Sequence, residues 1–344
     1  MTREALWFAF RDERLLVLEG DEPRVPLASN LEDLGLEASF SQPVGHLDGS
    51  SCWAAELPDG VEAPEGSAFV DLDEMGGIIV KSMTVSPWKG KPTPRMCETP
   101  SGMLNAIGIQ NKGVDHFLAE DLPWLLKKRA TVFASIAGNT VEEFVRVADK
   151  LRTGGRGIAA VEVNISCPNL EDRNNMFSHS KASTFAVVSK VKEALKRIPV
   201  FPKLSPNVTS LSEIADAALD AGADGLSLIN TVFGMSIDVE TRRPKLAGVV
   251  GGLSGPAIHP IAVRAVHEIH RNFPHVPIIG QGGIDRTSDA LQLMLAGASA
   301  VAVGTMNFVN PRASIDLATG IAEYMGRHKM TATAELVGAL KIEG

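Results

Sequence analysis

The chain has 344 residues, of which 44% are hydrophobic and 22% charged, and its formal net charge is −8 at pH 7. This composition is typical of a globular protein with a large core, and the length suits one large domain with a small additional module. Nucleic acid is not expected as a partner, because its phosphates bind basic surfaces. No apolar run approaches the roughly 18 residues of a membrane span, and the first residues lack the apolar core of a signal peptide. The expected compartment is therefore the cytoplasm.

Residues 1–75 differ in pattern from the rest of the chain. Leu6–Phe10 and Leu15–Glu19 flank a charged turn, which predicts an antiparallel hairpin. Stretches that contain proline and glycine follow through Gly66. We expect a small β-rich N-terminal segment without a long helix, and a boundary at residue 76.

From residue 76 onward, short apolar runs alternate with amphipathic stretches. Runs that are apolar at nearly every position indicate strands buried on both faces. Strands that alternate with helices along the chain indicate βαβ units in a parallel sheet. The sequence therefore predicts an α/β fold, a (β/α)₈ TIM barrel over residues 76–344, with an open doubly wound sheet as the alternative. The expected helices include Val141–Leu151, Thr184–Arg197, Leu211–Ala221, Ile261–Asn272 and Ser288–Ala296. The expected strands are Gly77–Ser82, Val132–Ala137, Ala159–Ser166, Val200–Ser205, Gly225–Asn230, Pro277–Gly280 and Ala300–Gly304.

Only seven strands are predicted, whereas a closed barrel of this type needs eight, so the missing strand must be the first. The β-rich segment stands in its place. Cys52–Leu57 and Ala68–Asp73 are its apolar candidates. The second is too close to Gly77 for a parallel crossover, which takes about a dozen residues. The first leaves more room but has no helical pattern after it.

The sequence contains three cysteines, Cys52, Cys97 and Cys167. An odd count without regular spacing predicts neither a disulfide framework nor a metal site. Cys167 follows a predicted strand and lies between Asn164 and Asn169, at the barrel rim where chemistry is built. A thiol has an ordinary pKa of about 8.5 and can act as a base when its surroundings lower that value. An isolated free cysteine is more often a small buried hydrophobe, which is our interpretation of Cys52 and Cys97.

Two lysines, Lys81 and Lys203, also stand at the ends of apolar strands. A lysine is costly to bury unless it meets an anion or an electron-rich partner, and the alternative is a side chain whose head reaches solvent. Two lysines at one rim would suit an electron-rich ring or a carboxylate.

Glycines follow the last two predicted strands, in Gly280–Gly283 and at Gly304, and more occur in Gly251–Gly255. Glycines at this place allow backbone amides to approach a phosphate group, which these barrels bind after their last two strands. The sequence therefore predicts a phosphate-binding site at this rim.

These residues lie within longer motifs that resemble the class 1 dihydroorotate dehydrogenases, most closely the NAD-linked 1B type. The motifs are KPTPRMCETPSGMLNAIGIQN (Lys91–Asn111), NISCPN (Asn164–Asn169), KLSPNVT (Lys203–Thr209), INTVFGMSIDVETRRP (Ile229–Pro244), GGLSGPAI (Gly251–Ile258), IGQGGI (Ile279–Ile284) and AGASAVAVGT (Ala296–Thr305).

The resemblance implies a barrel that binds FMN, in which Cys167 removes the C5 proton of dihydroorotate while the C6 hydride passes to the flavin. It implies FMN contacts from Lys81, Ser82, Ser135, Asn164, Lys203, Ile229, Gly255, Gly282, Gly283, Gly304 and Thr305. It implies contacts to dihydroorotate or orotate from Lys81, Asn105, Ala106, Ile107, Gly108, Ile109, Asn164, Asn230 and Thr231.

The similarity of these motifs to the 1B type also implies a partner. This would be an electron-transfer subunit with FAD and an iron–sulfur cluster, with NAD⁺ as the final oxidant and a homodimer of this chain inside a heterotetramer. Three cysteines are too few for this chain to hold such a cluster itself.

The N-terminal segment departs from the resemblance. The family opens with a strand that ends in Ala-Ser-Gly, whereas residues 1–75 resemble the N-terminal module of Nudix-type NADH pyrophosphatases without their catalytic box. Ser135 replaces an asparagine of the 1B family, and the loop after Asn169 lacks the usual paired glycines. A second interpretation is therefore a non-catalytic or FMN-deficient barrel in a rearranged or chimeric chain, and a third is a flavin barrel that reduces a related pyrimidine. We expect reduced stability or loose FMN binding.

Overall fold

The structure, a computed structural model, describes residues 70–166 and 176–342. Its main element is a seven-stranded sheet whose strands follow one another in chain order and pair in parallel. All seven predicted strands are present. They are β1 (Ile78–Ile79), β4 (Val132–Ile136), β5 (Ile158–Asn164), β6 (Val200–Leu204), β7 (Leu226–Leu228), β12 (Ile278–Gln281) and β13 (Ala300–Ala302).

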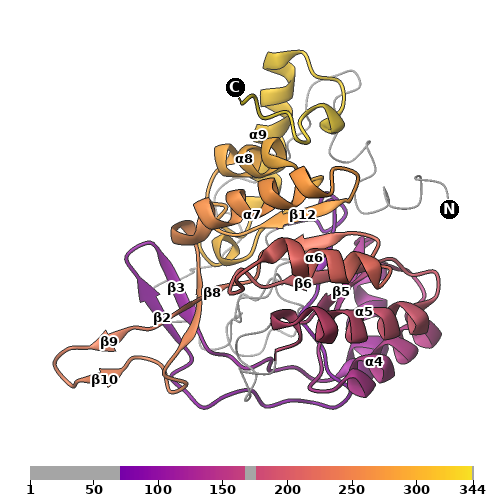
Figure 1. The fold of residues 1–344 in the computed structure, drawn as a ribbon, viewed down its shortest axis with the longest axis vertical. Helices are drawn as coiled ribbons and strands as arrows, with labels where there is room; N and C mark the ends of the chain where they lie inside the picture. Colours follow the sequence, from indigo (N-terminus) through magenta and orange to yellow (C-terminus); the bar gives the residue numbers. More distant parts are fainter. Residues whose placement is uncertain (1–69, 167–175, 343–344) are drawn as a thin grey trace.

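Helices alternate with these strands and pack against them (Figure 1). Thr140, Ser180 and Ser210 begin three of the helices, because each hydroxyl accepts a hydrogen bond from a backbone N–H of the first turn. No helix in the described parts is long and apolar enough to cross a membrane. The five predicted helices are α4 (Val141–Gly154), α5 (Lys181–Leu195), α6 (Leu211–Asp220), α7 (His259–Asn272) and α8 (Thr287–Ala296), and unpredicted ones include α3 (Leu122–Lys127) and α9 (Ala313–His328).

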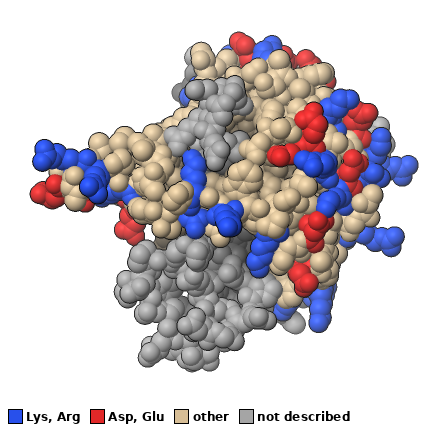
Figure 2. Space-filling view, turned by 90° about the horizontal axis from the view of Figure 1, so that it is seen from below, with Lys and Arg blue, Asp and Glu red and all other residues tan. Residues whose placement is uncertain are grey.

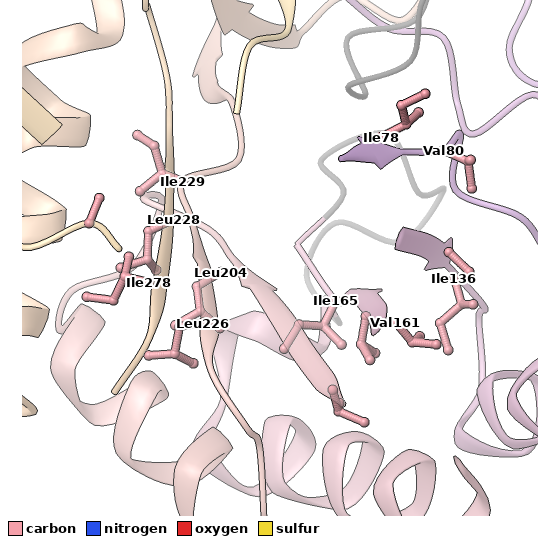
Figure 3. Packing of buried hydrophobic residues seen from close by; sticks show 14 of the residues in the cluster. Ile78, Val80, Ile136, Val161, Ile165, Leu204, Leu226, Leu228, Ile229 and Ile278 are labelled. Carbon is pink, nitrogen blue, oxygen red and sulfur yellow. The ribbon is translucent and has the colours of Figure 1, made fainter. Parts of the chain in front are cut away.

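The main hydrophobic core lies between the strands and the helices. Ile136, Val161, Leu204 and Leu226 come from four successive strands and are fully buried (Figure 3). They belong to one cluster with apolar side chains of the helices, such as those of α4 and α5. Burial on both faces explains why these strands have nearly continuous apolar sequences.

The sheet is curled, so that strands distant in the sheet order approach each other. The rings of Phe133 on β4 and Phe201 on β6 are 6.3 Å apart at their centroids, although β5 lies between the two strands. Residues of β1, β13 and α9 line one cavity of about 110 Å³. In a closed barrel, an eighth strand would lie between β1 and β13. Val70–Asp73 forms no strand, and residues 1–69, with the remainder of the segment expected there, lie outside the described residues.

A second, antiparallel sheet was not predicted. It has the order β2-β3-β11-β8 and consists of β2 (Met96–Thr99), β3 (Gly102–Asn105), β8 (Val232–Gly234) and β11 (Gly251–Ser254). Its strands belong to the connections that leave the carboxyl ends of β1 and β7, so this sheet covers that end of the parallel strands. Figure 1 also shows a projecting hairpin, β9 (Ile237–Asp238) with β10 (Arg243–Pro244). Figure 2 shows acidic and basic side chains interspersed on the face that it presents.

Candidate active site

The concave face of the parallel sheet carries two layers of side chains with different chemistry. Residues two positions apart on a strand point to the same face, so each strand can contribute one residue to each layer. The apolar layer consists of Ile79, Phe133, Ala160, Phe201, Ile279 and Ala300, which form one buried cluster. The polar layer lies nearer the carboxyl ends and consists of Ser135, Glu162, Lys203, Ser227 and Gln281, all of them buried.

Glu162 on β5 is the centre of the polar layer, and its side chain is only 1% exposed. One carboxylate oxygen, Oε1, accepts a hydrogen bond of 3.1 Å from the Ser135 hydroxyl, and Oε2 accepts one of 2.8 Å from the Ser227 hydroxyl. Gln281 Nε2 donates to the same Ser227 oxygen at 2.5 Å. The ammonium nitrogen of Lys203 lies 3.8 Å from Glu162 Oε1. This buried carboxylate is thus held by hydroxyl groups of β4 and β7 and balanced by a cation on β6, as buried charges require.

The polar layer continues into the rim through hydroxyl and amide groups. The Ser82 and Ser135 hydroxyl oxygens are 2.9 Å apart, and Asn164 Nδ2 donates to Ser82 Oγ at 3.0 Å. Asn230 Nδ2 donates to Ser166 Oγ at 3.0 Å and to Asn164 Oδ1 at 3.4 Å. The structure therefore joins Ser82, Ser135, Asn164 and Asn230, four of the predicted site residues, in one network.

The antiparallel sheet brings Asn105 and Thr231 to the same end. Asn105 on β3 pairs with Gly252 on β11, and its Nδ2 donates to the Gly252 carbonyl oxygen at 3.4 Å. A Cβ atom at Gly252 would lie 2.1 Å from the hydroxyl of Thr231, whose backbone N–H donates to Asn230 Oδ1 at 2.7 Å. Only a glycine at position 252 allows the Thr231 side chain to approach the backbone of β11 so closely.

Other predicted substrate residues have side chains that lie apart from this network. Ala106 packs in a cluster with Leu104 and Leu246, and Ile109 packs against Ala137. Ile107 is buried, and Gly108 has a left-handed backbone with φ of +76°. Several backbone groups of this run are bonded within the chain. The Ala106 N–H donates to the Arg95 carbonyl oxygen at 2.7 Å, the Ile107 carbonyl oxygen accepts from the Lys91 N–H at 2.9 Å, and the Ile109 carbonyl oxygen accepts from Asn111 Nδ2 at 2.8 Å. Lys81 is half-buried directly before Ser82, two residues after the end of β1.

The predicted phosphate glycines lie together where three connections meet. A Cβ atom at Gly283 would lie 2.7 Å from the Gly255 carbonyl oxygen, and one at Gly282 would lie 3.3 Å from Ile229 Cγ1. Gly255, Gly282 and Gly283 have φ values of +91°, +130° and +66°, which favour glycine. A Cβ atom at Gly304 would meet nothing within 4 Å, and Thr305 begins the short 3₁₀ helix Thr305–Phe308. The glycines thus form a backbone cradle without side chains of its own.

Three residues of the site were missed from the sequence: Glu162, Ser227 and Gln281. Their signal was a polar residue inside an otherwise apolar strand, which is unusual for a strand buried on both faces. The predicted base, Cys167, lies outside the described residues, directly after the buried Ser166. No group of three or more His, Cys, Asp or Glu side chains within residues 70–166 and 176–342 is arranged to hold a metal ion.

The model of the dihydroorotate dehydrogenase family matches residues 59–325, beginning before the expected boundary at residue 76. The chain belongs to this family. Similar relatives include two proteins described as dihydroorotate dehydrogenase B (NAD(+)), catalytic subunit. The one from Desulforamulus reducens is 50% identical over 275 residues, which cover 80% of this chain and 90% of that protein. The one from Geotalea daltonii is 48% identical over 313 residues, covering 90% and 99%. The resemblance to class 1B enzymes is thereby confirmed.

A solved dihydroorotate dehydrogenase, from Eimeria tenella in complex with ferulenol, is similar in structure, with a TM-score of 0.64. The two chains are 21% identical, and the match covers 77% of this chain and 78% of that one. At this level of identity the likeness concerns the fold. It confirms the predicted α/β barrel class.

Proposed function

We propose that this chain oxidises dihydroorotate to orotate in pyrimidine biosynthesis, with Cys167 as the base and bound FMN as the acceptor of the hydride. The observation that carries the proposal is the polar network at the carboxyl ends of the strands. It joins Ser82, Ser135, Asn164 and Asn230 in a chain that belongs to this family.

The residues present fit FMN. Gly255, Gly282 and Gly283 have no room for a Cβ atom because other parts of the chain pack against them. Their positive φ values form glycine turns, whose backbone N–H groups can bind a phosphate as helix N-termini do. The open space at Gly304 adds a fourth approach from the next strand. Lys203 supplies a buried positive charge for an electron-rich ring edge. Ile229, beside Gly282, offers an apolar contact.

Dihydroorotate would be held by amides and backbone groups of the rim. Asn105, Asn164, Asn230 and Thr231 present donors and acceptors from the ends of β3 and β5 and from the segment after β7, which suits a planar pyrimidine with amide edges. Cys167 follows Ser166, whose hydroxyl accepts from Asn230. The Sγ atom would take the C5 proton as the substrate loses its C6 hydride, so that proton and hydride leave from neighbouring carbons.

We further propose that two copies of this chain assemble with a partner subunit that carries FAD and an iron–sulfur cluster, with NAD⁺ as the final oxidant. The names of the relatives, which contain both NAD(+) and catalytic subunit, support a partner of this kind. A cytoplasmic location belongs to the same proposal.

The experiment is dihydroorotate oxidation by the full chain with an artificial electron acceptor, together with the flavin absorbance of the purified protein. Cys167→Ala should lower kcat by about 100- to 10,000-fold, because a general base contributes a factor of that size. Cys97→Ala is the matched control, since Cys97 lies on β2 and belongs to a small apolar cluster, and it should retain wild-type kcat.

Two outcomes would contradict the proposal in different ways. Wild-type kcat in Cys167→Ala would remove the thiol from the reaction. Wild-type protein without flavin absorbance, and without uptake of added FMN, would instead favour the FMN-deficient barrel.

A further inference from the structure

Glu162 is a buried acid that the proposed reaction does not use. Its side chain is 1% exposed, and that of Lys203 is 5% exposed. Removing either charge from water is costly, and each charge offsets part of the cost of the other. An acid kept at such a place needs an explanation, because replacing a buried ion pair with apolar side chains is often neutral or stabilising.

The geometry of the pair distinguishes Glu162 from Lys203. The carboxylate is fixed by hydroxyl donors on both sides, from Ser135 at 3.1 Å and Ser227 at 2.8 Å. Ser227 is in turn held by Gln281. The Lys203 nitrogen stays 3.8 Å away, which is longer than a hydrogen bond. The acid therefore attracts the ammonium group without taking up its N–H donors.

We propose that Glu162 is a positioning residue that holds the ammonium group of Lys203 at the flavin edge and sets the charge balance of the site. This inference rests on the proposed function. Glu162 is anchored one layer below the rim, so its attraction fixes the depth of the Lys203 side chain while the N–H donors remain available to a ligand. The pair has no net charge, so the field at the flavin depends on the separation of its two charges.

The test measures three properties of the full chain: the reduction potential of the bound FMN, FMN retention after gel filtration, and the kinetic constants. Glu162→Gln keeps the size of the side chain and an oxygen acceptor but removes the negative charge. We expect a more positive reduction potential, a kcat lowered by about tenfold, and a KM for dihydroorotate within about twofold of wild type. Glu162→Asp retains the charge and should restore the potential toward the wild-type value.

The matched control is Glu193→Gln on α5. Glu193 forms an ion pair of 2.8 Å with Lys190, but both side chains are exposed, at 64% and 59%. The same substitution in an exposed pair should change neither the potential nor kcat, because solvent screens the lost charge.

A double-mutant cycle with Lys203→Met tests whether Glu162 acts through Lys203. If it does, Glu162→Gln should shift the potential less when Lys203 is already replaced, and fully additive effects would overturn the inference. If Glu162→Gln does not fold, the cycle is made with Glu162→Asp, whose smaller shift must also decrease in the Lys203→Met background. Equal potentials in wild type, Glu162→Gln and Glu162→Asp would likewise overturn it. Failure of the proposed function is distinct, because the wild-type protein itself would then bind no FMN or leave dihydroorotate unoxidised.

Discussion

The apolar and polar layers of the concave face are only two residues apart on the same strands, yet they do different work. Phe133 and Ser135 are neighbours on β4, and Phe201 and Lys203 are neighbours on β6. The apolar layer gains stability from burial in proportion to its area. The polar layer has to satisfy every donor, acceptor and charge before it contributes anything. The fold therefore places its stabilising apolar contacts toward the amino ends of the strands and its reactive polar groups toward their carboxyl ends.

The largest expected effect tests the apolar layer. Phe133→Ala should lower the free energy of unfolding by about 3–5 kcal/mol, because it removes a fully buried ring and leaves a cavity beside Phe201. Urea denaturation followed by circular dichroism measures this change. Phe185→Ala on α5 is the control, since that ring is 46% exposed and its loss should cost much less. A loss below about 1 kcal/mol in Phe133→Ala would mean that the layer is loosely packed.

A smaller effect is expected in the polar layer. Ser227→Ala removes the donor to Glu162 and the acceptor of Gln281, and should lower the free energy of unfolding by about 1–3 kcal/mol. Ser189→Ala on α5 is the matched control, because its hydroxyl donates to the Ala186 backbone carbonyl of the same helix. Urea denaturation compares both variants. A Ser227→Ala protein as stable as wild type would show that the hydrogen bonds of Ser227 to Glu162 and Gln281 do not stabilise the polar layer.

The strands of the parallel sheet could be predicted because burial on both faces leaves a local trace. Val200–Leu204 is apolar throughout except for Lys203, and it is bounded by turn residues. The antiparallel sheet could not be predicted in this way. Its strands have only three or four residues each, and most of them contain glycine. Their pairing joins Asn105 to Gly252 across 147 positions. Contacts of that separation depend on how the chain folds back, which no local pattern records.

The site divides along the same line. Lys203 and Asn164 could be placed at the rim because each ends a strand, and parallel strands bring their carboxyl ends together. Glu162 lies inside its strand, and its partners come from β4, β6 and β7. Which polar residue meets which depends on the curl and the stagger of the sheet. That information lies in the packing of all the strands together.

The smallest expected effect concerns a polar group outside both layers, His270 on α7. Its Nδ1 atom is buried without a hydrogen-bond partner in the described parts of the chain, whereas the groups of the polar layer are paired. Burial lowers the pKa of His270 below its ordinary value, and the nearby His267 and His275 lower it further. The folded protein therefore favours neutral His270, while the unfolded chain binds a proton below about pH 6.5. Because the unfolded state then holds more protons, the free energy of unfolding should fall as the pH drops below that value.

Glutamine does not titrate, so His270→Gln should weaken this pH dependence when urea denaturation at pH 7.5 is compared with pH 5.5. The pH dependence that remains should come from residues such as His179, whose pKa burial also lowers. If variant and wild type lose equal free energy of unfolding between pH 7.5 and 5.5, protonation of the unpaired His270 does not destabilise the fold. Hydrogen-bond pairing would then not be the property that distinguishes the polar layer from other buried polar groups.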